Sequence, residues 1–449
     1  MPGVAVSIGR VARAAKLRFA AGMVLAAAAT WLAPAHAQLN ILITKAPPRP
    51  VPIAIVPFGG TGSAAPAIDI AAVVTADLRS SGRFAPLPLT DMVSRPTQPS
   101  DVNFQNWRLL KTDYLVIGQL TEDSPDRFTA VFQLFDVLRG EQSLGFRLQA
   151  GRADLRATAH KISDMIFEKI TGIPGVFSTQ IAYVSEERRA DNSKRFRLIV
   201  SDADGENARV IADSPQPLMS PAWSPDARRV AYVSFEGQQS AVYVQTLRTG
   251  TRERVSSRAG VNSAPAFSPD GRTLAITLSH DNGNLDVYTL DLATQQLKQL
   301  TTDDAIDTEA SWSPDGRTVY FTSDRAGGPQ VYRVGAGGGR PERVSYEGVY
   351  NARPRLSPDG KIIAVVYGQN NTYRIAAVET ANGNLRILTT GKLDESPSFA
   401  PNGAQIIYAT RENGRGVLAS VSTDGLIQTQ IASVAGDVRE PVWGPFPRP

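Results

Sequence analysis

The sequence predicts an α/β N-terminal domain followed by an all-β six-bladed β-propeller. The propeller is predicted by a short phrase based on Ser-Pro-Asp-Gly that recurs six times, with β-branched and aromatic runs between copies. The copies begin at Trp223, Phe267, Trp312, Leu356, Phe399 and Trp443, at steps of 44, 45, 44, 43 and 44 residues. Short strands repeated at this period are typical of four-stranded propeller blades. Before residue 172 the period is absent and strand and helix patterns alternate, which predicts the α/β domain.

The repeated phrase fits a tight turn. Its Ser, Pro and Gly suit a type I turn, because Pro fixes φ at about −65° and Gly accepts the left-handed conformation. The residue ahead of the turn is usually aromatic and is expected to pack between blades. Three copies depart from the pattern, with Ala227 in place of Gly, Ala310 in place of Pro and Leu356 in place of an aromatic residue. We expect these departures to weaken single turns or contacts and to leave the ring intact.

The two ends of the repeat region are expected to pair. The run Ile181–Ser185 resembles the strand that follows each turn but precedes every copy of the phrase, and the copy at Trp443 has no strand after it. Pairing these two segments closes the ring and leaves no open sheet edge.

The α/β domain is expected over residues 52–172, the linker over 173–179 and the propeller over 180–449. Hydrophobic periodicity predicts strands at Ile53–Phe58, Tyr114–Gly118 and Phe128–Phe135, and helices at Asp69–Ser81 and Asp154–Thr171. Gly172 is a typical helix stop.

Residues 1–37 read as a cleaved signal peptide. Basic residues between Arg10 and Arg18 precede the apolar stretch Phe19–Ala33, and Ala35-His-Ala37 is a small-residue cleavage site. Residues 38–51 are then expected to be a mobile N-terminal docking strand on a proline-rich leash, because the prolines between Lys45 and Pro50 cannot join a central strand.

Composition excludes several classes of function. Cleavage lowers the number of Lys and Arg from 47 to 43, which equals the number of Asp and Glu, so the basic patch of a nucleic-acid-binding protein is absent. The absence of Cys excludes disulfides and thiolate chemistry. His160 and His280 lack a partner signature and are expected to be structural or surface residues, so we expect no enzyme, no cofactor and no metal site. The acidic stretch Asp303–Glu309 predicts a solvated loop; the alternative is a calcium ion in the propeller channel.

The chain resembles the TolB family, the periplasmic component of the Tol-Pal system of Gram-negative bacteria. The resemblance covers the secretion leader, the N-terminal strand, the α/β domain and the propeller. The phrases that carry it are Ala76–Gly82, Phe167–Gly172, Gln216–Asp226, Ala264–Gly271 and Val421–Gly425.

The resemblance implies a monomeric, non-enzymatic periplasmic adaptor that contacts membranes only through its partners, the outer-membrane lipoprotein Pal and the C-terminal domain of TolA. Such an adaptor supports outer-membrane integrity and constriction at division, and colicins exploit it. The TolA-binding residues implied are Gln38, Leu39, Asn40, Ile41, Leu42, Ile43 and Thr44. The alternative is an exported propeller hydrolase. A peptidase would need a hydrolase domain with a Ser-His-Asp set, and a lactonase would need a metal on the ring axis.

The expected Pal site follows from propeller geometry together with the resemblance. The Asp-Gly turns join each innermost strand to the second strand, so the segments before the innermost strands line the central opening on the opposite face. The resemblance implies Pal contacts at Val261–Ala264 and Asp307–Glu309. The candidate Pal-binding residues are Met219, Ser220, Val261, Asn262, Ser263, Ala264, Asp307, Thr308, Glu309, Asn351, Ala352, Arg353, Glu395 and Arg439.

Overall fold

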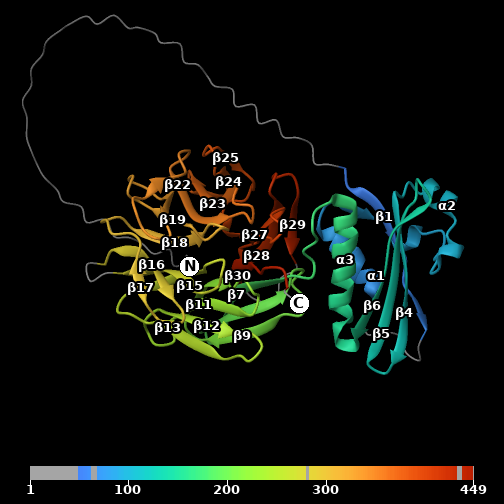
Figure 1. The fold of residues 1–449 in the computed structure, drawn as a ribbon, viewed down its shortest axis with the longest axis horizontal. Helices are drawn as coiled ribbons and strands as arrows, with labels where there is room; N and C mark the ends of the chain where they lie inside the picture. Colours follow the sequence, from blue (N-terminus) through green and yellow to red (C-terminus); the bar gives the residue numbers. More distant parts are fainter. Residues whose placement is uncertain (1–48, 62–67, 280–282, 432–436, 448–449) are drawn as a thin grey trace, which may run out of the picture. The chain divides into compact units, whose positions relative to one another are not determined.

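The computed structural model describes residues 49–61, 68–279, 283–431 and 437–447. The expected signal peptide and residues 38–48 of the expected docking strand and leash lie outside these described residues, whereas Val51 already belongs to the first strand of the sheet. Residues 45–449 form one compact unit. In its described part, a mixed sheet with helices is followed along the chain by six four-stranded sheets (Figure 1), which confirms the predicted fold class.

The N-terminal sheet has the strand order β3-β1-β4-β5-β6, and β2 also pairs with β4. β1 pairs in parallel with β3 and β4, whereas β4, β5 and β6 are antiparallel neighbours. The strands are β1 (Val51–Ile55), β2 (Gly59–Thr61), β3 (Phe84–Pro86), β4 (Tyr114–Ser124), β5 (Arg127–Asp136) and β6 (Glu141–Gly151).

The helices are α1 (Ile70–Ser80), α2 (Phe104–Leu109) and α3 (Leu155–Thr171), with short 3-10 turns η1 (Leu89–Asp91), η2 (Pro99–Asp101) and η3 (Arg152–Asp154). The Asp69 carboxylate accepts a hydrogen bond from the Ala72 amide at 3.1 Å and caps the start of α1. Gly172 ends α3 with a φ of 73°, a left-handed conformation that glycine adopts without steric cost. The two predicted helices are therefore confirmed, with their ends set by the expected residues.

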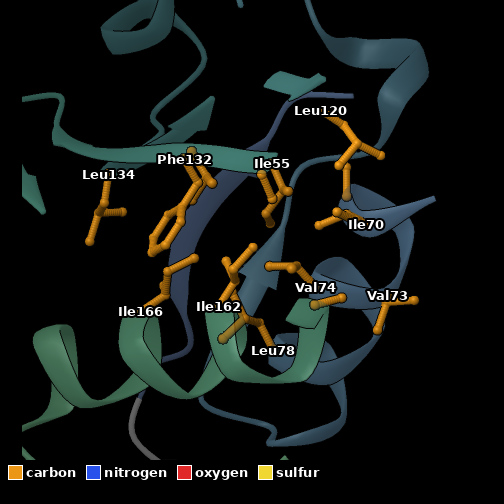
Figure 2. Packing of buried hydrophobic residues seen from close by; sticks show 14 of the residues in the cluster. Ile55, Ile70, Val73, Val74, Leu78, Leu120, Phe132, Leu134, Ile162 and Ile166 are labelled. Atoms are coloured by element: carbon orange, nitrogen blue, oxygen red, sulfur yellow. The ribbon is translucent and has the colours of Figure 1, made fainter. Parts of the chain in front are cut away.

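The larger of the two core clusters of this domain lies between the sheet and the pair α1 and α3. Ile55 and Phe132 of the sheet pack in one cluster with Val74 and Leu78 of α1 and Ile162 of α3 (Figure 2). Burying each such side chain contributes about 1.5–3 kcal/mol. The surface of α1 and α3 that faces away from the sheet is thereby held in a fixed position.

The propeller strands follow in chain order. Blade one is β10 (Leu218–Trp223), β11 (Arg229–Ser234), β12 (Ala241–Thr246) and β13 (Arg252–Ser256), and blade two is β14 (Asn262–Phe267), β15 (Thr273–Ser279), β16 (Leu285–Asp291) and β17 (Leu297–Gln299). Blade three is β18 (Asp307–Trp312), β19 (Thr318–Ser323), β20 (Gln330–Gly335) and β21 (Glu342–Arg343), and blade four is β22 (Tyr350–Leu356), β23 (Ile362–Gln369), β24 (Thr372–Glu379) and β25 (Leu385–Ile387). Blade five is β26 (Glu395–Phe399), β27 (Gln405–Glu412), β28 (Arg415–Ser422) and β29 (Gln428–Ile431).

Blade six joins the two ends of the repeat region. It consists of β30 (Asp437–Trp443), β7 (Gln180–Arg188), β8 (Lys194–Asp202) and β9 (Arg209–Ser214), and β30 lies beside β7 (Figure 1). Trp443 pairs with Ile181 in an antiparallel register. The predicted closure of the ring is confirmed.

The repeated phrase forms the predicted turn. In the second copy the Gly271 amide donates to the Ser268 carbonyl at 2.9 Å, and the Ser268 hydroxyl donates to Asp270 at 2.6 Å and accepts from the Thr273 amide at 3.0 Å. Ala227, which replaces glycine in the first copy, keeps the same hydrogen bond and adopts a φ of 59°. The turn thus survives the departure, with a side chain in a conformation that favours glycine.

The residues ahead of the turns contact the preceding blade. The indole N–H of Trp223 donates to the Val442 carbonyl of blade six at 3.2 Å, and that of Trp312 donates to the Ala266 carbonyl of blade two at 3.1 Å. This confirms the expected packing between blades.

Candidate functional site: a ring of strained residues at the propeller axis

Each innermost strand contains a β-bulge near its start. The register of pairing with the second strand shifts at one equivalent place in all six blades. One non-glycine residue in each bulge has a φ between 47° and 58°. These six residues, here called the bulge ring, are Ser220, Ala264, Glu309, Arg353, Ser396 and Glu440.

The sequence favours a bulge at these positions because five of the six ring residues precede a proline. Proline has no N–H to donate to the ladder, so pairing is interrupted there. Glu309 precedes Ala310 instead and adopts the same conformation, with a φ of 58°. A left-handed non-glycine residue costs about 1–2 kcal/mol, and strain of this kind concentrates at binding and active sites.

The bulge ring lies at the opposite end of the innermost strands from the Asp-Gly turns. In blade one, for example, Ser220 is near the start of β10, and the turn at Asp226 follows the end of this strand. The repeat places the other five blades in the same orientation. The ring residues therefore share one face of the propeller.

Arg353 connects several blades across this face. Its Nε lies 3.1 Å from Glu309 Oε1 in blade three, and its Nη2 lies 3.3 Å from Glu440 Oε2 in blade six. Its Nη1 also donates to the hydroxyl of Ser396 in blade five. Glu440 accepts a further hydrogen bond from the Ser220 amide at 2.5 Å. Five of the six ring residues thus belong to one polar network.

The electrostatics of the network depend on burial. Burial alone would lower the pKa of Arg353, but the carboxylates of Glu440, Glu309 and Glu395 raise it, so this guanidinium stays charged. Arg355 differs, because burial and the nearby Arg353 lower its pKa to about 10. The two arginines and Glu440 line a small cavity of about 20 Å³. This volume is enough for one water molecule.

The structure separates the candidate Pal-binding residues into two groups. Met219 and Val261 are exposed, and the remaining residues of the first group are partly exposed: Ser220, Ser263, Ala264, Thr308, Glu309, Arg353, Glu395 and Arg439. The second group is buried and consists of Asn262, Asp307, Asn351 and Ala352. Sequence analysis did not distinguish the groups, and Pal contact by any of these residues stays a prediction.

The buried polar residues hold the loops that carry the ring. Asn262 accepts from the Arg258 amide at 2.9 Å, and Asn351 donates to the Glu347 carbonyl at 2.7 Å. Asp307 accepts from Arg325 at 2.7 Å, yet burial raises its pKa to about 6. These side chains position neighbouring residues and are not presented to a partner in the free protein.

Sequence analysis omitted Ser396, Glu440 and Arg355 from the candidate residues. The sequence does carry a signal for two of them, because a proline inside the innermost strand follows the ring residue. This proline identifies Ser396 and Glu440 by analogy with Ser220 and Arg353. No equivalent signal marks Arg355, because its position depends on which side chains converge at the axis.

The acidic stretch considered for calcium has arginine partners. Arg325 lies 2.9 Å from Asp303 and 2.7 Å from Asp307, and Glu309 pairs with Arg353. Guanidinium groups thus neutralise three carboxylates of the stretch. The expected TolA-binding residues 38–44 and His280 lie outside the described residues. None of the helices that the structure describes is long and apolar enough to cross a membrane.

Comparison with known proteins identifies the family. The model described as the TolB amino-terminal domain matches residues 39–143, and the model described as the TolB beta propeller domain matches residues 167–447. The Tol-Pal system protein TolB of Xanthomonas euvesicatoria pv. vesicatoria (strain 85-10) is 46% identical over 410 residues, which cover 91% of this chain and 93% of that protein. The chain belongs to the TolB family.

A solved structure and a second relative agree with this family assignment. The crystal structure of TolB from Acinetobacter baumannii superimposes with a TM-score of 0.82 and 41% sequence identity, covering 90% of this chain and 98% of that chain. The TolB protein of Xanthomonas axonopodis pv. citri (strain 306) is 46% identical over 410 residues, 91% of this chain and 93% of that protein. The TolB family is a non-enzymatic component of the Tol-Pal system, so the alternative of an exported hydrolase is not supported.

Proposed function

We propose that the protein is a periplasmic adaptor that binds the lipoprotein Pal through the bulge ring and its surroundings, and the C-terminal domain of TolA through residues 38–44. In this role it supports outer-membrane integrity and envelope constriction at division, and it contacts the membranes through these partners. Membership of the TolB family supports the proposal. The observation that supports the proposed binding of Pal is the bulge ring, which has one strained residue per blade on one face of the propeller.

The chemistry of this face suits a protein partner. A strained backbone held by a closed ring is fixed before binding, so little conformational entropy is lost on association. Met219 and Val261, next to or near bulge-ring residues in the sequence, are exposed, and the ring itself contributes the charged pair of Arg353 and Glu309. An apolar contact with a polar, hydrated surround is typical of specific protein interfaces, and arginine is enriched among the residues that carry binding energy.

The proposed Pal binding predicts that an arginine introduced into the bulge ring, or directly next to it, blocks binding. We expect Ala264→Arg or Thr308→Arg to weaken Pal binding at least about tenfold, or about 1.4 kcal/mol, because a long cation would obstruct the face and lose solvation on contact. Calorimetric titration with purified Pal measures the effect, and the thermal midpoint of each variant shows whether the propeller remains folded.

Matched controls lie on the opposite face. Arg272 and Arg317 are exposed beside the Asp-Gly turns, and their backbone amides donate to Asp270 and Asp315. Arg272→Glu and Arg317→Glu should leave Pal affinity within about twofold, because exposed charges far from an interface contribute little. Loss of binding in these variants alone would place the Pal site on the Asp-Gly face and refute the proposal.

The TolA half predicts that residues 38–44 bind as an added strand. Deleting them should abolish binding to the C-terminal domain of TolA, because a free apolar strand supplies main-chain hydrogen bonds to a partner's sheet edge. The thermal midpoint should change little, since these residues precede the first strand of the folded domain, β1. Full TolA affinity in the truncated protein would show that the docking strand is not the TolA site.

A further inference from the structure

A buried histidine lies on the side of α3 that contacts blade six. The side chain of His160 is 2% exposed, and its Nδ1 lies 2.8 Å from Oδ2 of Asp77 on α1. The same carboxylate oxygen accepts from the Ser163 hydroxyl at 2.6 Å. Because the oxygen is an acceptor for both groups, Nδ1 carries a hydrogen in either protonation state of the ring.

The other ring nitrogen faces two more carboxylates. His160 Nε2 lies 3.8 Å from Oδ2 of Asp202, at the end of β8, and 4.0 Å from Oδ2 of Asp204 in the turn that follows. It has no hydrogen-bond partner within the part of the chain that the structure describes. Arg156, one helical turn earlier on α3, contacts the same two residues: its Nε lies 3.6 Å from Asp202, and its Nη2 donates to Asp204.

The charges of this cluster favour a proton on Nε2. Asp77, Asp202 and Asp204 supply three negative charges, and Arg156 neutralises one of them. With a neutral ring, the lone pair of a buried nitrogen would point at carboxylate oxygens, an arrangement that leaves the nitrogen unsatisfied. With an imidazolium ring, a positive charge lies 3.8 and 4.0 Å from these oxygens and is attracted to them as an ion pair.

We propose that His160 is held as an imidazolium and completes a proton-dependent clamp, here called the His160 clamp, that ties helix α3 to blade six of the propeller. In the clamp, His160 and Arg156 present their N–H groups from one face of α3 to Asp202 and Asp204. Loss of the proton leaves Arg156 alone against these carboxylates and weakens the attachment. The clamp does not depend on the proposed binding of Pal or TolA.

The charged neighbours of His160 give the direction of the pH dependence. Burial lowers its pKa, but the hydrogen bond and charge of Asp77 and the charges of Asp204 and Asp202 outweigh burial, so the pKa is raised above 6.5. Arg156 is the cation that opposes this rise. A raised folded-state pKa means that the stabilisation is fully present below about pH 6.5 and is lost as the pH rises through the folded value.

Protons from solvent can reach the clamp. Asp77, Arg156 and Asp204 line a cavity of about 370 Å³. Ligand atoms of Asp77, His160 and Asp204 also lie within 4.8 Å of one another, a spacing that by itself would admit a cation. The guanidinium of Arg156 already donates a hydrogen bond to the carboxylate of Asp204. We therefore favour a proton on His160 over a metal ion bound to the cluster.

The test compares the full mature chain with His160→Gln, Asp204→Asn and the control His280→Gln. We expect the difference in thermal midpoint between the wild type and His160→Gln to shrink as the pH rises from about 5.5 to about 8.5, on either side of the ordinary histidine pKa. His280→Gln should keep the wild-type pH dependence. Asp204→Asn retains the shape of a partly exposed side chain and should shift the imidazole titration to lower pH in NMR spectra.

A second measurement addresses the attachment itself. The Gly205 amide donates to the Asp202 carbonyl at 2.9 Å in the turn of the clamp. After correction for the intrinsic pH dependence of exchange, protection of amides 202–206 should fall with rising pH in the wild type and should be low throughout in His160→Gln. This readout remains available if the midpoint changes are small.

Each contrary result overturns the clamp. An imidazole of His160 that titrates below about pH 6.5 would show that burial outweighs the carboxylates. An equal pH dependence in the wild type and His160→Gln would show that the proton does not stabilise the attachment. A rise in midpoint on adding Zn²⁺ that disappears in His160→Gln would identify the cluster as a metal site instead.

Discussion

Two of the settings in which left-handed residues occur, the Asp-Gly turns and the bulge ring, differ in their use of glycine. The Asp-Gly turns place Gly271 and Gly316 at φ values of 70° and 71°, whereas the bulge ring uses larger residues at similar φ values. A turn needs only the conformation, for which glycine has the lowest cost. The ring also needs side chains that reach the axis, such as Arg353, so strain is retained there together with the interactions that these side chains make.

Gly271 and Gly316 form a matched pair for testing this difference. An added Cβ at Gly271 would lie 3.2 Å from Pro225 Cγ, whereas at Gly316 it would lie 3.6 Å from Pro269 Cδ. We expect Gly316→Ala to lower the free energy of unfolding by about 1–2 kcal/mol, the cost of a left-handed alanine. Gly271→Ala should cost more, because the rigid proline ring must also move.

Urea unfolding measures the loss of unfolding free energy in both variants. The first copy of the turn supplies a control in which the unfolding free energy is expected to rise. Ala227 already has a φ of 59°, so Ala227→Gly relieves the left-handed strain and should raise stability by up to about 1 kcal/mol, after the entropic cost of glycine is subtracted. Equal losses in Gly271→Ala and Gly316→Ala would show that contact with the neighbouring proline has no effect.

Residue partners are the part of the site that the sequence predicts least well. His160 and Asp77 are separated by 83 positions, and Arg353 and Glu440 by 87. No local pattern connects such pairs, because the folded backbone alone brings them together. For this reason sequence analysis identified His160 as structural or surface without its carboxylates, and included Arg353 without its network.

At the scale of elements, strong periodicity and explicit end signals predicted the helices well. Asp69 and Gly172 appear at the ends of α1 and α3 as cap residues. Strand boundaries agreed less closely: β1 spans Val51–Ile55 where Ile53–Phe58 was expected, and β4 extends to Ser124. Extended strands continue through polar residues when a neighbouring strand pairs with them, and the sequence does not show that neighbour.

Several elements of the α/β domain, β6 and α2 among them, and the six bulges were not predicted. β6 contains Gly145 and several charged or polar residues, and much of it is exposed, so its hydrophobic alternation is weak. α2 has six residues, too few for a helical period to be recognised. The bulges are invisible to periodicity because the extra residue occurs at the start of a short strand, and proline is the one sequence feature that accompanies them.

At the scale of the whole molecule, the two halves are stabilised in different ways. The α/β domain has a larger core cluster between its sheet and helices α1 and α3, with residues such as Ile55, Phe132 and Ile162, and a smaller one around Trp107 of α2. The propeller instead has a separate cluster between neighbouring blades at each step around the ring. Each blade therefore depends on its neighbours, and the stability of the ring depends on its closure.

Ring closure depends on β30. Trp443 is 8% exposed, its indole N–H donates to the Thr179 hydroxyl at 2.8 Å, and its amide donates to the Ser398 hydroxyl of blade five at 3.0 Å. Removal of a buried tryptophan typically costs about 3–5 kcal/mol, a large part of the 5–15 kcal/mol that stabilises a typical domain. Loss of β30 would also leave the edge of β7 without a partner, open to pairing with another chain.

We therefore expect deletion of residues 437–449 to lower the propeller transition in calorimetry sharply or to abolish it, while a transition of the α/β domain remains because its core lies outside the ring. Deletion of residues 446–449 is the matched control. It retains Trp443 and the Gly444 amide, which donates to the Gln180 carbonyl at 2.7 Å, so its thermogram should resemble that of the full chain. Identical propeller transitions in the two truncated proteins would mean that the ring is stable without closure. The packing between the remaining blades would then be sufficient to stabilise the propeller without β30. The expected result would instead show that β30 controls the stability of the whole propeller, and with it that of the bulge ring, to which all six blades contribute.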